Sequence, residues 1–223
     1  MQKRFKKCGG ITGVLFLIFV VFTVLVKTVD VQAIGPEQSA VGFASVNGVV
    51  AELFGVNMVW YQITEWLGAV AIAAAMGFAV LGLVQMVRRR SVWKVDGRIL
   101  LLGAFYFLVV VFYAFFEVVV INYRPVILAE GLEASFPSSH TMVSICIMVT
   151  AMMQFHHYLR GKRAMLRAAD MVFGLILAAT VIGRLVSGVH WFTDIVGGVL
   201  LASALIALYC TALLYMQEKG WGK

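Results

Sequence analysis

Residues 183–194 read GRLVSGVHWFTD. They place three polar side chains, Arg184, His190 and Asp194, among residues that are otherwise mostly apolar. Because His190 and Asp194 are four residues apart, they would share one face of a helix, where a carboxylate can orient an imidazole and stabilise its cation. Charges inside a membrane segment are costly and usually face a polar cavity, so this stretch is a candidate functional site.

Two further motifs lie at the ends of apolar runs and offer matching chemistry. Arg124-Pro125 follows one long run, and Pro137-Ser138-Ser139-His140 precedes the next. With the first stretch they supply two arginines, two histidines, an aspartate and hydroxyl groups. This set suits an anionic tetrahedral group: the arginines bind its oxygens, one histidine attacks it, and the other protonates the leaving group.

The composition is that of an integral membrane protein. The chain has 223 residues, of which 62% are hydrophobic and only 13% are charged, whereas soluble domains are about a quarter charged. Its net charge of +7 must therefore be interpreted by position before it suggests nucleic acid. The three cysteines, Cys8, Cys146 and Cys210, are far apart and lack metal-type spacing, so we expect no disulfide framework.

The apolar segments predict an all-α fold, a polytopic bundle of about six transmembrane helices. A helix rises about 1.5 Å per residue, so the fifth segment reaches across only if it is extended to include Arg184. The six predicted spans are residues 8–26, 67–87, 99–116 (continuing to 123), 139–155, 170–188 and 195–216.

The region before the second span allows alternatives. Residues 8–26 are either a retained membrane anchor, which we favour, or a signal peptide with a loose cleavage-like sequence at 31–33. Residues 28–59 contain apolar side chains that could form a helix on the membrane surface, and an ordered loop is equally compatible with them. Trp60, Tyr61 and Trp66 are expected as an interfacial belt before the second span.

The positions of the basic residues predict the topology. With the N-terminus inside, the inner segments hold 15 of the 18 Lys and Arg residues, and the outer ones hold only Lys27, Arg124 and Arg184. This is a strong positive-inside bias, and it explains the basic charge without nucleic acid. It predicts cytoplasmic N- and C-termini and brings the three polar motifs to the outer side of the bundle.

The motifs resemble those of the type 2 phosphatidic acid phosphatase superfamily, which includes lipid phosphatases, glucose-6-phosphatase and vanadium haloperoxidases. The family signature is Lys-x6-Arg-Pro, Pro-Ser-Gly-His and Ser-Arg-x5-His-x3-Asp. The corresponding residues are Glu117-x6-Arg124-Pro125, Pro137-Ser138-Ser139-His140 and Gly183-Arg184-x5-His190-x3-Asp194. The resemblance covers about residues 60–216, and the membrane members have six helices with the site at the outer face.

The resemblance implies a role for each matched residue. His190 would attack phosphorus and form a phosphohistidine, and Asp194 would orient it. His140 would protonate the leaving group, while phosphate oxygens would be bound by Arg124, Arg184, Ser138 and, through its backbone N–H, Ser139. No metal or cofactor is implied. The expected organisation is a single membrane domain over 1–223, with 1–59 as first helix and extracytoplasmic segment and 60–216 as the phosphatase core.

Three positions depart from the family pattern. Ser139 replaces a glycine, and Gly183 replaces a serine and removes one hydroxyl. Glu117 replaces the lysine and reverses a charge, and on a continuous helix it would face the same way as Arg124, seven residues on. It could pair with Arg124, contact a cationic part of the substrate, or weaken activity; we favour these in that order.

The sequence therefore predicts a metal-independent phosphatase of the cell membrane. It would hydrolyse a lipid phosphate or pyrophosphate at the extracytoplasmic face, with membrane lipids as its partners and no nucleic acid. Candidate substrates are undecaprenyl diphosphate, phosphatidylglycerophosphate and phosphatidic acid, and the oligomeric state is open. The alternatives are a lipid phosphotransferase using the same histidine, a low-activity lipid-binding or transport protein, a serine hydrolase using Ser187 or Ser138, and a zinc hydrolase.

Overall fold

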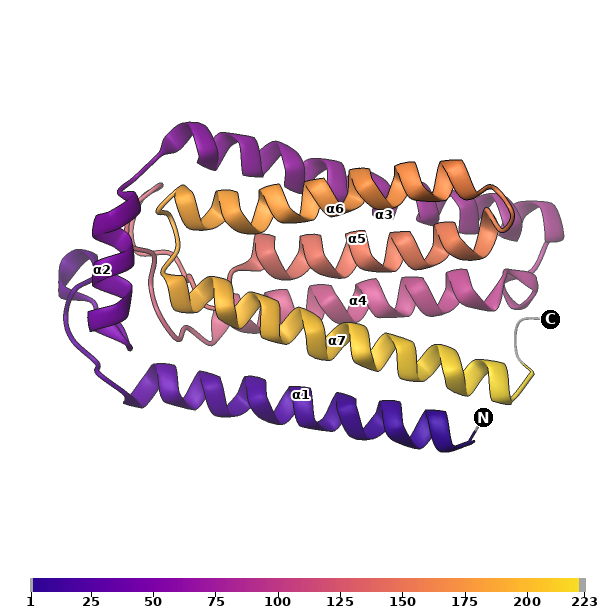
Figure 1. The fold of residues 1–223 in the computed structure, drawn as a ribbon, viewed down its shortest axis with the longest axis horizontal. Coiled ribbons are helices and arrows are strands. Elements are labelled where there is room, and N and C mark those ends of the chain that lie inside the picture. The colour runs from indigo at the N-terminus through magenta and orange to yellow at the C-terminus, as the bar shows by residue number, and fades with distance from the viewer. Residues whose placement is uncertain (1, 221–223) are drawn as a thin grey trace.

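The computed structural model describes residues 2–220, and most of that chain is helical. Figure 1 shows long helices running side by side, with one short helix across their ends. The α-helices are α1 (Gln2–Thr28), α2 (Ala44–Phe54), α3 (Met58–Arg89), α4 (Gly97–Val118), α5 (Ser139–Tyr158), α6 (Arg163–Val186) and α7 (Phe192–Glu218). Short 3-10 turns occupy Pro36–Gln38 and Val92–Lys94.

The six long helices follow the predicted spans, which confirms the all-α membrane fold. Five of them, α1, α3, α4, α6 and α7, are long and apolar enough to cross a membrane. The sixth, α5, has 20 residues and contacts α3, α4, α6 and α7. It buries polar side chains such as Thr150 and Gln154 in the middle of the bundle, which is why it is less apolar than its neighbours.

Several predicted boundaries were wrong, and one error matters for the site. The second span was predicted to begin at residue 67, but α3 begins at Met58, so Trp60, Tyr61 and Trp66 lie within the helix. The side chain of Asn57 caps α3 by accepting hydrogen bonds from the N–H groups of Val59 and Trp60. The third span ends with α4 at Val118 and does not continue to residue 123.

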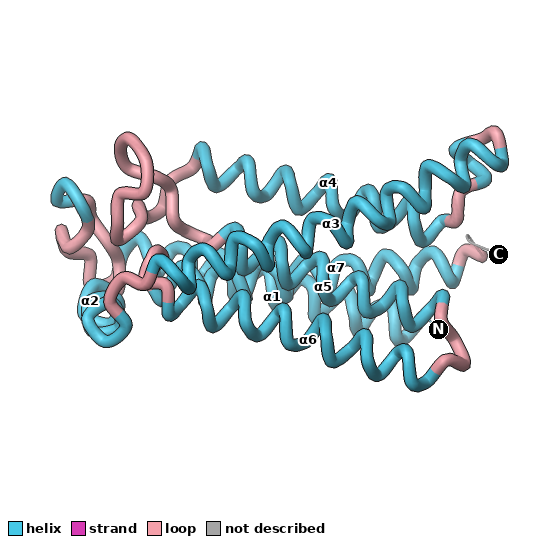
Figure 2. The backbone as a smooth tube through the Cα atoms, turned by 90° about the horizontal axis from the view of Figure 1, so that it is seen from above, coloured by secondary structure: helices cyan, strands magenta, loops and turns pink. Residues whose placement is uncertain are grey.

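The two ends of the bundle differ in character (Figures 1 and 2). One end, here called the terminal end, carries the beginning of α1, the end of α7 and the α3–α4 and α5–α6 connections. The other, here called the site end, carries α2, the long loop 119–138 and the connection 187–191. The basic connecting residues, such as Arg90 and Arg160, lie at the terminal end, and all three predicted motifs lie at the site end.

The α2 helix braces the site end, where the sequence left a surface helix and a loop as alternatives. The side chain of buried Asn47 donates to the hydroxyl oxygen of Thr193 (2.9 Å) and accepts from the Thr193 backbone N–H (3.2 Å). The backbone N–H of Asn57 donates to the carbonyl of Ser187 (3.0 Å). The connection between α6 and α7 is therefore held against α2 and the start of α3.

An aromatic cluster fixes the loop that carries the second motif. Phe136 is 1% exposed. Its ring stacks on the ring of Phe19 of α1 and packs edge-to-face against the ring of Phe116 of α4, and the ring centroids are 6.3 Å apart in both pairs. A Cβ atom at Gly197 of α7 would come within 2.4 Å of the Phe136 ring, so only glycine lets the ring lie this close. Ser135 and Pro137, on either side of Phe136, are thereby held in place.

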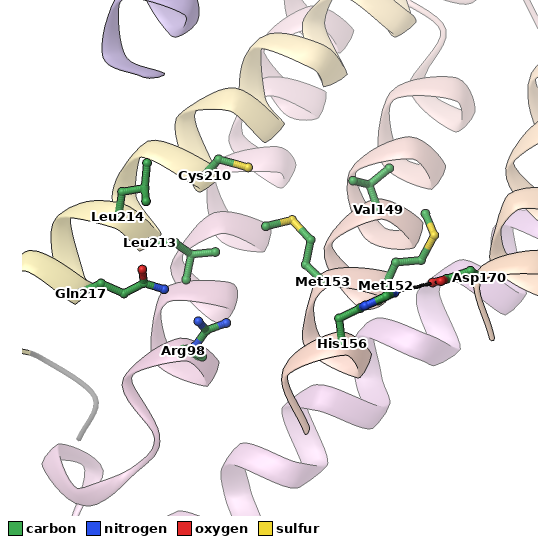
Figure 3. Close-up of a pocket in the computed structure, with 10 residues that line it drawn as sticks. All are labelled: Arg98, Val149, Met152, Met153, His156, Asp170, Cys210, Leu213, Leu214 and Gln217. Carbon is green, nitrogen blue, oxygen red and sulfur yellow. Dashed lines mark hydrogen bonds and ion pairs between the residues drawn. The ribbon is translucent and has the colours of Figure 1, made fainter. Parts of the chain in front are cut away.

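The terminal end contains a cavity of about 550 Å³ between α4, α5, α6 and α7 (Figure 3). Apolar side chains such as Met153 and Leu213 line it, with Arg98 and Gln217 on one side. On another side His156 Nε2 lies 2.9 Å from a carboxylate oxygen of Asp170. His156 of α5 is thus paired with Asp170 of α6.

Candidate active site

The site end brings together polar groups from four separate segments. Arg124 comes from the loop after α4, His140 from the first turn of α5, Arg184 from the last turn of α6, and His190 from the connection before α7. Backbone contacts join these segments: the Ser138 N–H donates to the Asp194 carbonyl, and Trp191 Nε1 donates to the carbonyl of Tyr123, the residue before Arg124. The three polar motifs, which the sequence analysis predicted to lie on the same side of the bundle, are therefore neighbours in space.

His190 and Asp194 are linked through a third residue, Ser135. The Ser135 hydroxyl donates to Asp194 Oδ2 and lies 3.1 Å from His190 Nδ1. The hydroxyl has one proton, which goes to the carboxylate, so its oxygen accepts from Nδ1–H. This tautomer leaves Nε2 of His190 with a free lone pair, which is the form a nucleophile requires.

The helical explanation for the His190–Asp194 pair was wrong. His190 precedes α7, which begins at Phe192, and its Nδ1 atom is 3.7 Å from Asp194 Oδ2. That distance allows an ion pair but exceeds a hydrogen bond, and the Ser135 hydroxyl spans it.

Asp194 is fixed by the backbone around it. Its Oδ2 atom accepts from the Trp191 N–H (2.8 Å), and its own carbonyl accepts from the Ser138 N–H (2.9 Å). Trp191 in turn donates from its ring nitrogen to the carbonyl of Tyr123 (2.7 Å). The beginning of α7, the beginning of α5 and the loop after α4 are thus connected at Asp194.

Arg184 and His140 share one carboxylate, that of Glu65 on α3. Arg184 is fully buried, and its Nη2 atom donates to Glu65 Oε1. His140 Nε2 lies 3.2 Å from the same oxygen. The Arg184 guanidinium also lies over the ring of Tyr61, with its Cζ atom 5.2 Å from the ring centroid. Three helices therefore meet at Glu65.

Arg124 pairs with Glu133 and not with Glu117, which corrects the favoured prediction. Arg124 Nε lies 2.9 Å from Glu133 Oε2, and the Arg124 backbone N–H donates to the Glu133 carbonyl. The prediction failed because it assumed a continuous helix from 117 to 124. Glu117 is exposed near the end of α4, beside a small cavity that Ser135 and Ser139 also line.

The serines of the motifs have structural partners. Ser138 is the N-cap of α5, and its hydroxyl oxygen accepts from the Thr141 N–H (3.4 Å). The Ser187 hydroxyl donates to the carbonyl of Arg184 (2.8 Å), so it is part of the end of α6. In the part of the chain that the structure describes, neither hydroxyl bonds a histidine, so these contacts give no support to a serine hydrolase.

Buried polar atoms without partners gather at this end. Among residues 2–220 they include Nε and Nη1 of Arg184, Nη1 of Arg124, Nδ1 of His140 and Nε2 of His190. Buried polar groups are normally hydrogen-bonded, so such a group of unpartnered nitrogens calls for an explanation. An anion with several oxygens would satisfy the guanidinium donors together.

A largely apolar cavity of about 740 Å³ adjoins these groups. It runs between α3, α4 and α5, with Glu65 and His140 among its lining residues. The rest of the lining is mainly aliphatic and aromatic, including Ile72, Val110 and Ile147. The shape places a polar end beside His140 and an apolar remainder along the helices, as an amphiphilic ligand requires.

The electrostatics favour a neutral His190. Burial first, and then the positive charges of Arg124 and Arg184, hold the pKa of His190 well below its ordinary value of 6.5. An uncharged imidazole at neutral pH is a competent nucleophile, whereas an imidazolium is not.

Fold and site together define a polytopic membrane protein with a buried histidine, a carboxylate linked to it and two arginines at one end of the bundle. A family model of the PAP2 superfamily matches residues 104–218, slightly more than half of the chain. The chain belongs to the PAP2 superfamily and is a multi-pass membrane protein.

One solved structure shares the fold over nearly the whole chain. It is the crystal structure of a transmembrane PAP2-type phosphatidylglycerolphosphate phosphatase from Bacillus subtilis, with a TM-score of 0.59 and 18% sequence identity. The match covers 92% of this chain and 96% of that one. None of the curated proteins matches the sequence.

Sequence reasoning missed two residues of the site, Glu65 and Ser135. Glu65 lies two residues before the predicted second span, residues 67–87, which contains no charged residue. Ser135 lies two residues before Pro137, outside the motif that drew attention to this loop. No motif spacing identifies either residue, because their partners are distant in the sequence. Glu65 contacts Arg184, 119 residues away, and Ser135 contacts His190, 55 residues away.

Proposed function

We propose that this protein hydrolyses the terminal phosphate of a membrane lipid, a phosphate monoester or a diphosphate, through a phosphohistidine on His190. The observation that carries the proposal is the unpartnered Nε2 of buried His190, together with unpartnered guanidinium nitrogens of Arg184 and Arg124. A nucleophile and two cationic groups that lack partners suit a phosphoryl group.

The reaction has two steps. In the first, Nε2 of His190 attacks phosphorus, the bond from phosphorus to the leaving oxygen breaks, and His140 gives that oxygen a proton. In the second, His140 takes a proton from a water molecule as this water attacks the phosphorus of the phosphohistidine, the P–N bond to His190 Nε2 breaks, and inorganic phosphate leaves. Asp194 and Ser135 hold His190 in the reactive tautomer, and the arginines balance the charge of the equatorial oxygens.

The cavity supports a lipid as the substrate class. Its apolar walls between α3, α4 and α5 suit a hydrocarbon chain, with the phosphate next to His140. Undecaprenyl diphosphate, phosphatidylglycerophosphate and phosphatidic acid all have this form. The basic connections lie at the terminal end, and by the positive-inside rule this distribution favours a site end outside the cytoplasm.

The decisive experiment measures phosphate release by the purified protein from a panel of these lipids, with EDTA present throughout. We expect release without added metal, and its loss by at least about a thousandfold in His190→Ala. Protein that is incubated with labelled substrate and then denatured in detergent at alkaline pH should carry an alkali-stable, acid-labile phosphate that is absent from this variant. Release that survives the substitution would refute the assigned nucleophile.

The same assay separates hydrolysis from phosphate transfer. Both reactions pass through phosphohistidine, and they differ in whether water or a lipid hydroxyl accepts the phosphoryl group. Adding an acceptor lipid should leave inorganic phosphate as the main product. A phosphorylated acceptor lipid as the main product would identify a phosphotransferase instead.

A further inference from the structure

The site contains a carboxylate where its chemistry calls for an anion. Glu65 Oε1 contacts Arg184 Nη2 and lies 3.2 Å from His140 Nε2. These are the two side chains assigned to phosphate binding and to leaving-group protonation. Glu65 belongs to none of the three motifs, and it comes from a helix, α3, that carries no other residue of the reaction.

A buried arginine explains why a carboxylate stands here. The Arg184 side chain is 0% exposed, and an unpaired charge at such a position is strongly unfavourable. Glu65 supplies the counter-charge through one nitrogen of the guanidinium, while Nε and Nη1 remain without partners. Glu65 Oε1 also lies 3.2 Å from His140 Nε2, so it can accept a hydrogen bond from that ring nitrogen and fix the orientation of the imidazole.

Substrate binding changes this balance. A phosphoryl group bound by Arg184 brings negative charge next to Glu65, and like charges at this distance repel each other. The Glu65 side chain is 34% exposed and lines the 740 Å³ cavity, so it has room to withdraw from Arg184. Withdrawal from Arg184 leaves the contact with His140 available.

We propose that Glu65 is a positioning residue with two tasks: it neutralises Arg184 until the substrate phosphate replaces it, and it holds His140 as a proton donor. The carboxylate therefore opposes phosphate binding and supports leaving-group protonation. This inference rests on the proposed function. It makes two predictions of opposite sign for one substitution, which a merely structural role would not produce.

The test is Glu65→Gln, which keeps the size of the side chain and removes its charge. Inorganic phosphate should bind roughly tenfold more tightly, because the repulsion is gone. The value of kcat for the lipid substrate should fall about tenfold or more, because His140 loses its charged partner. Phosphate binding is measured by calorimetry on the purified protein, and kcat by steady-state kinetics.

Two further variants make the result specific. Glu65→Asp keeps the charge but shortens the side chain, so it should restore part of kcat, and it also serves if the glutamine variant folds poorly. Glu52→Gln removes a carboxylate from exposed α2 at the same end, and it should change neither quantity. Phosphate binding in Glu65→Gln that is unchanged or weaker would overturn the inference, as would an unchanged kcat.

This outcome is distinguishable from failure of the proposed function. If the unmodified protein releases no phosphate from any lipid, the function fails, yet calorimetry with inorganic phosphate still tests the repulsion by Glu65. If the protein hydrolyses lipids and Glu65→Gln binds phosphate no more tightly, only the inference about Glu65 fails.

Discussion

A single hydroxyl decides which nitrogen of His190 carries the proton. Ser135 lies between His190 Nδ1 and Asp194 Oδ2, and it passes the orienting effect of the carboxylate to the imidazole across a 3.7 Å separation. Asp194 itself is fixed by the Trp191 N–H. The tautomer of His190 therefore depends on a loop residue outside the family motifs.

Replacing Ser135 should slow the chemical step more than it weakens binding. In Ser135→Ala the imidazole loses its link to Asp194, and we expect kcat to fall about 10- to 100-fold with little change in KM. Ser135→Thr keeps the hydroxyl and should recover much of the rate. Steady-state kinetics on the three proteins would decide, and a wild-type kcat in Ser135→Ala would remove the serine from the mechanism.

The acid limb of the pH profile should report His190. Its pKa lies well below 6.5 because of burial and the charges of Arg124 and Arg184. Protonation of Nε2 removes the nucleophile. Activity should therefore persist at pH 6.5 and decline only at pH values well below it. In Arg124→Gln one depressing charge is gone, and the limb should move to higher pH. A limb above 6.5 in the unmodified protein, after correction for titration of the substrate, would contradict this assignment.

Glu117 occupies the family lysine position, and its charge should hinder the substrate. It is exposed near the end of α4 and has no ion pair with Arg124 in the described chain. Glu117→Lys replaces a distant repulsion by an attraction, so we expect phosphatase activity at low substrate to rise about threefold. Kinetics at low ionic strength would show it best. A large fall in activity would mean that the glutamate has a positive role of its own.

At the scale of elements, the close approach of α3 to α6 explains why residue 183 is glycine. A Cβ atom there would lie 2.6 Å from Cγ2 of Thr64 and 3.1 Å from the ring of Trp60. The family serine does not fit against this α3. The closeness also brings Glu65, the residue after Thr64, to Arg184, the residue after Gly183.

Gly183→Ser should therefore destabilise the protein, although it restores the family residue. Overpacking of this kind costs about 1–3 kcal/mol, and a lower melting temperature with reduced activity is expected. Adding Thr64→Ser removes the obstructing methyl group and keeps the hydroxyl that bonds the Tyr61 carbonyl. The double variant should recover most of the loss in a thermal unfolding assay. Equal stability of Gly183→Ser and the unmodified protein would show that the helices separate at little cost.

The elements also show how far the sequence can be interpreted. Hydropathy located all six long helices, because a lipid-facing helix must be apolar over its whole crossing. It misplaced the start of α3 because a helix that supplies a site residue carries a charge, here Glu65, inside its apolar length. It also extended α4 too far, since nothing local marks Val118 as the end. Arg124, His140, Arg184, His190 and Asp194 were predictable from motif spacing, whereas Ser135 and Glu65 act through long-range contacts.

At the scale of the whole molecule, the arrangement of charge predicts its orientation in the membrane. The terminal end carries the basic connections, and the site end carries few cations. We expect single cysteines, introduced into a chain without Cys8, Cys146 and Cys210, to report the two sides. Glu52→Cys should react with a membrane-impermeant maleimide on intact cells, and Lys162→Cys only after permeabilisation. The reverse pattern would turn the catalytic site toward the cytoplasm.

The pairing of α1 with α7 has a consequence for biogenesis. The first and last helices pack together, with the hydroxyls of Thr12 and Thr211 3.1 Å apart and the rings of Phe5 and Tyr215 5.8 Å apart. During synthesis the first helix enters the bilayer long before its partner leaves the ribosome. Asp194 belongs to α7, so a chain that stops before this helix would lack both the contact with α1 and a residue of the proposed site. The contact with α1 and the proposed site are thus both completed only when α7 has been synthesised.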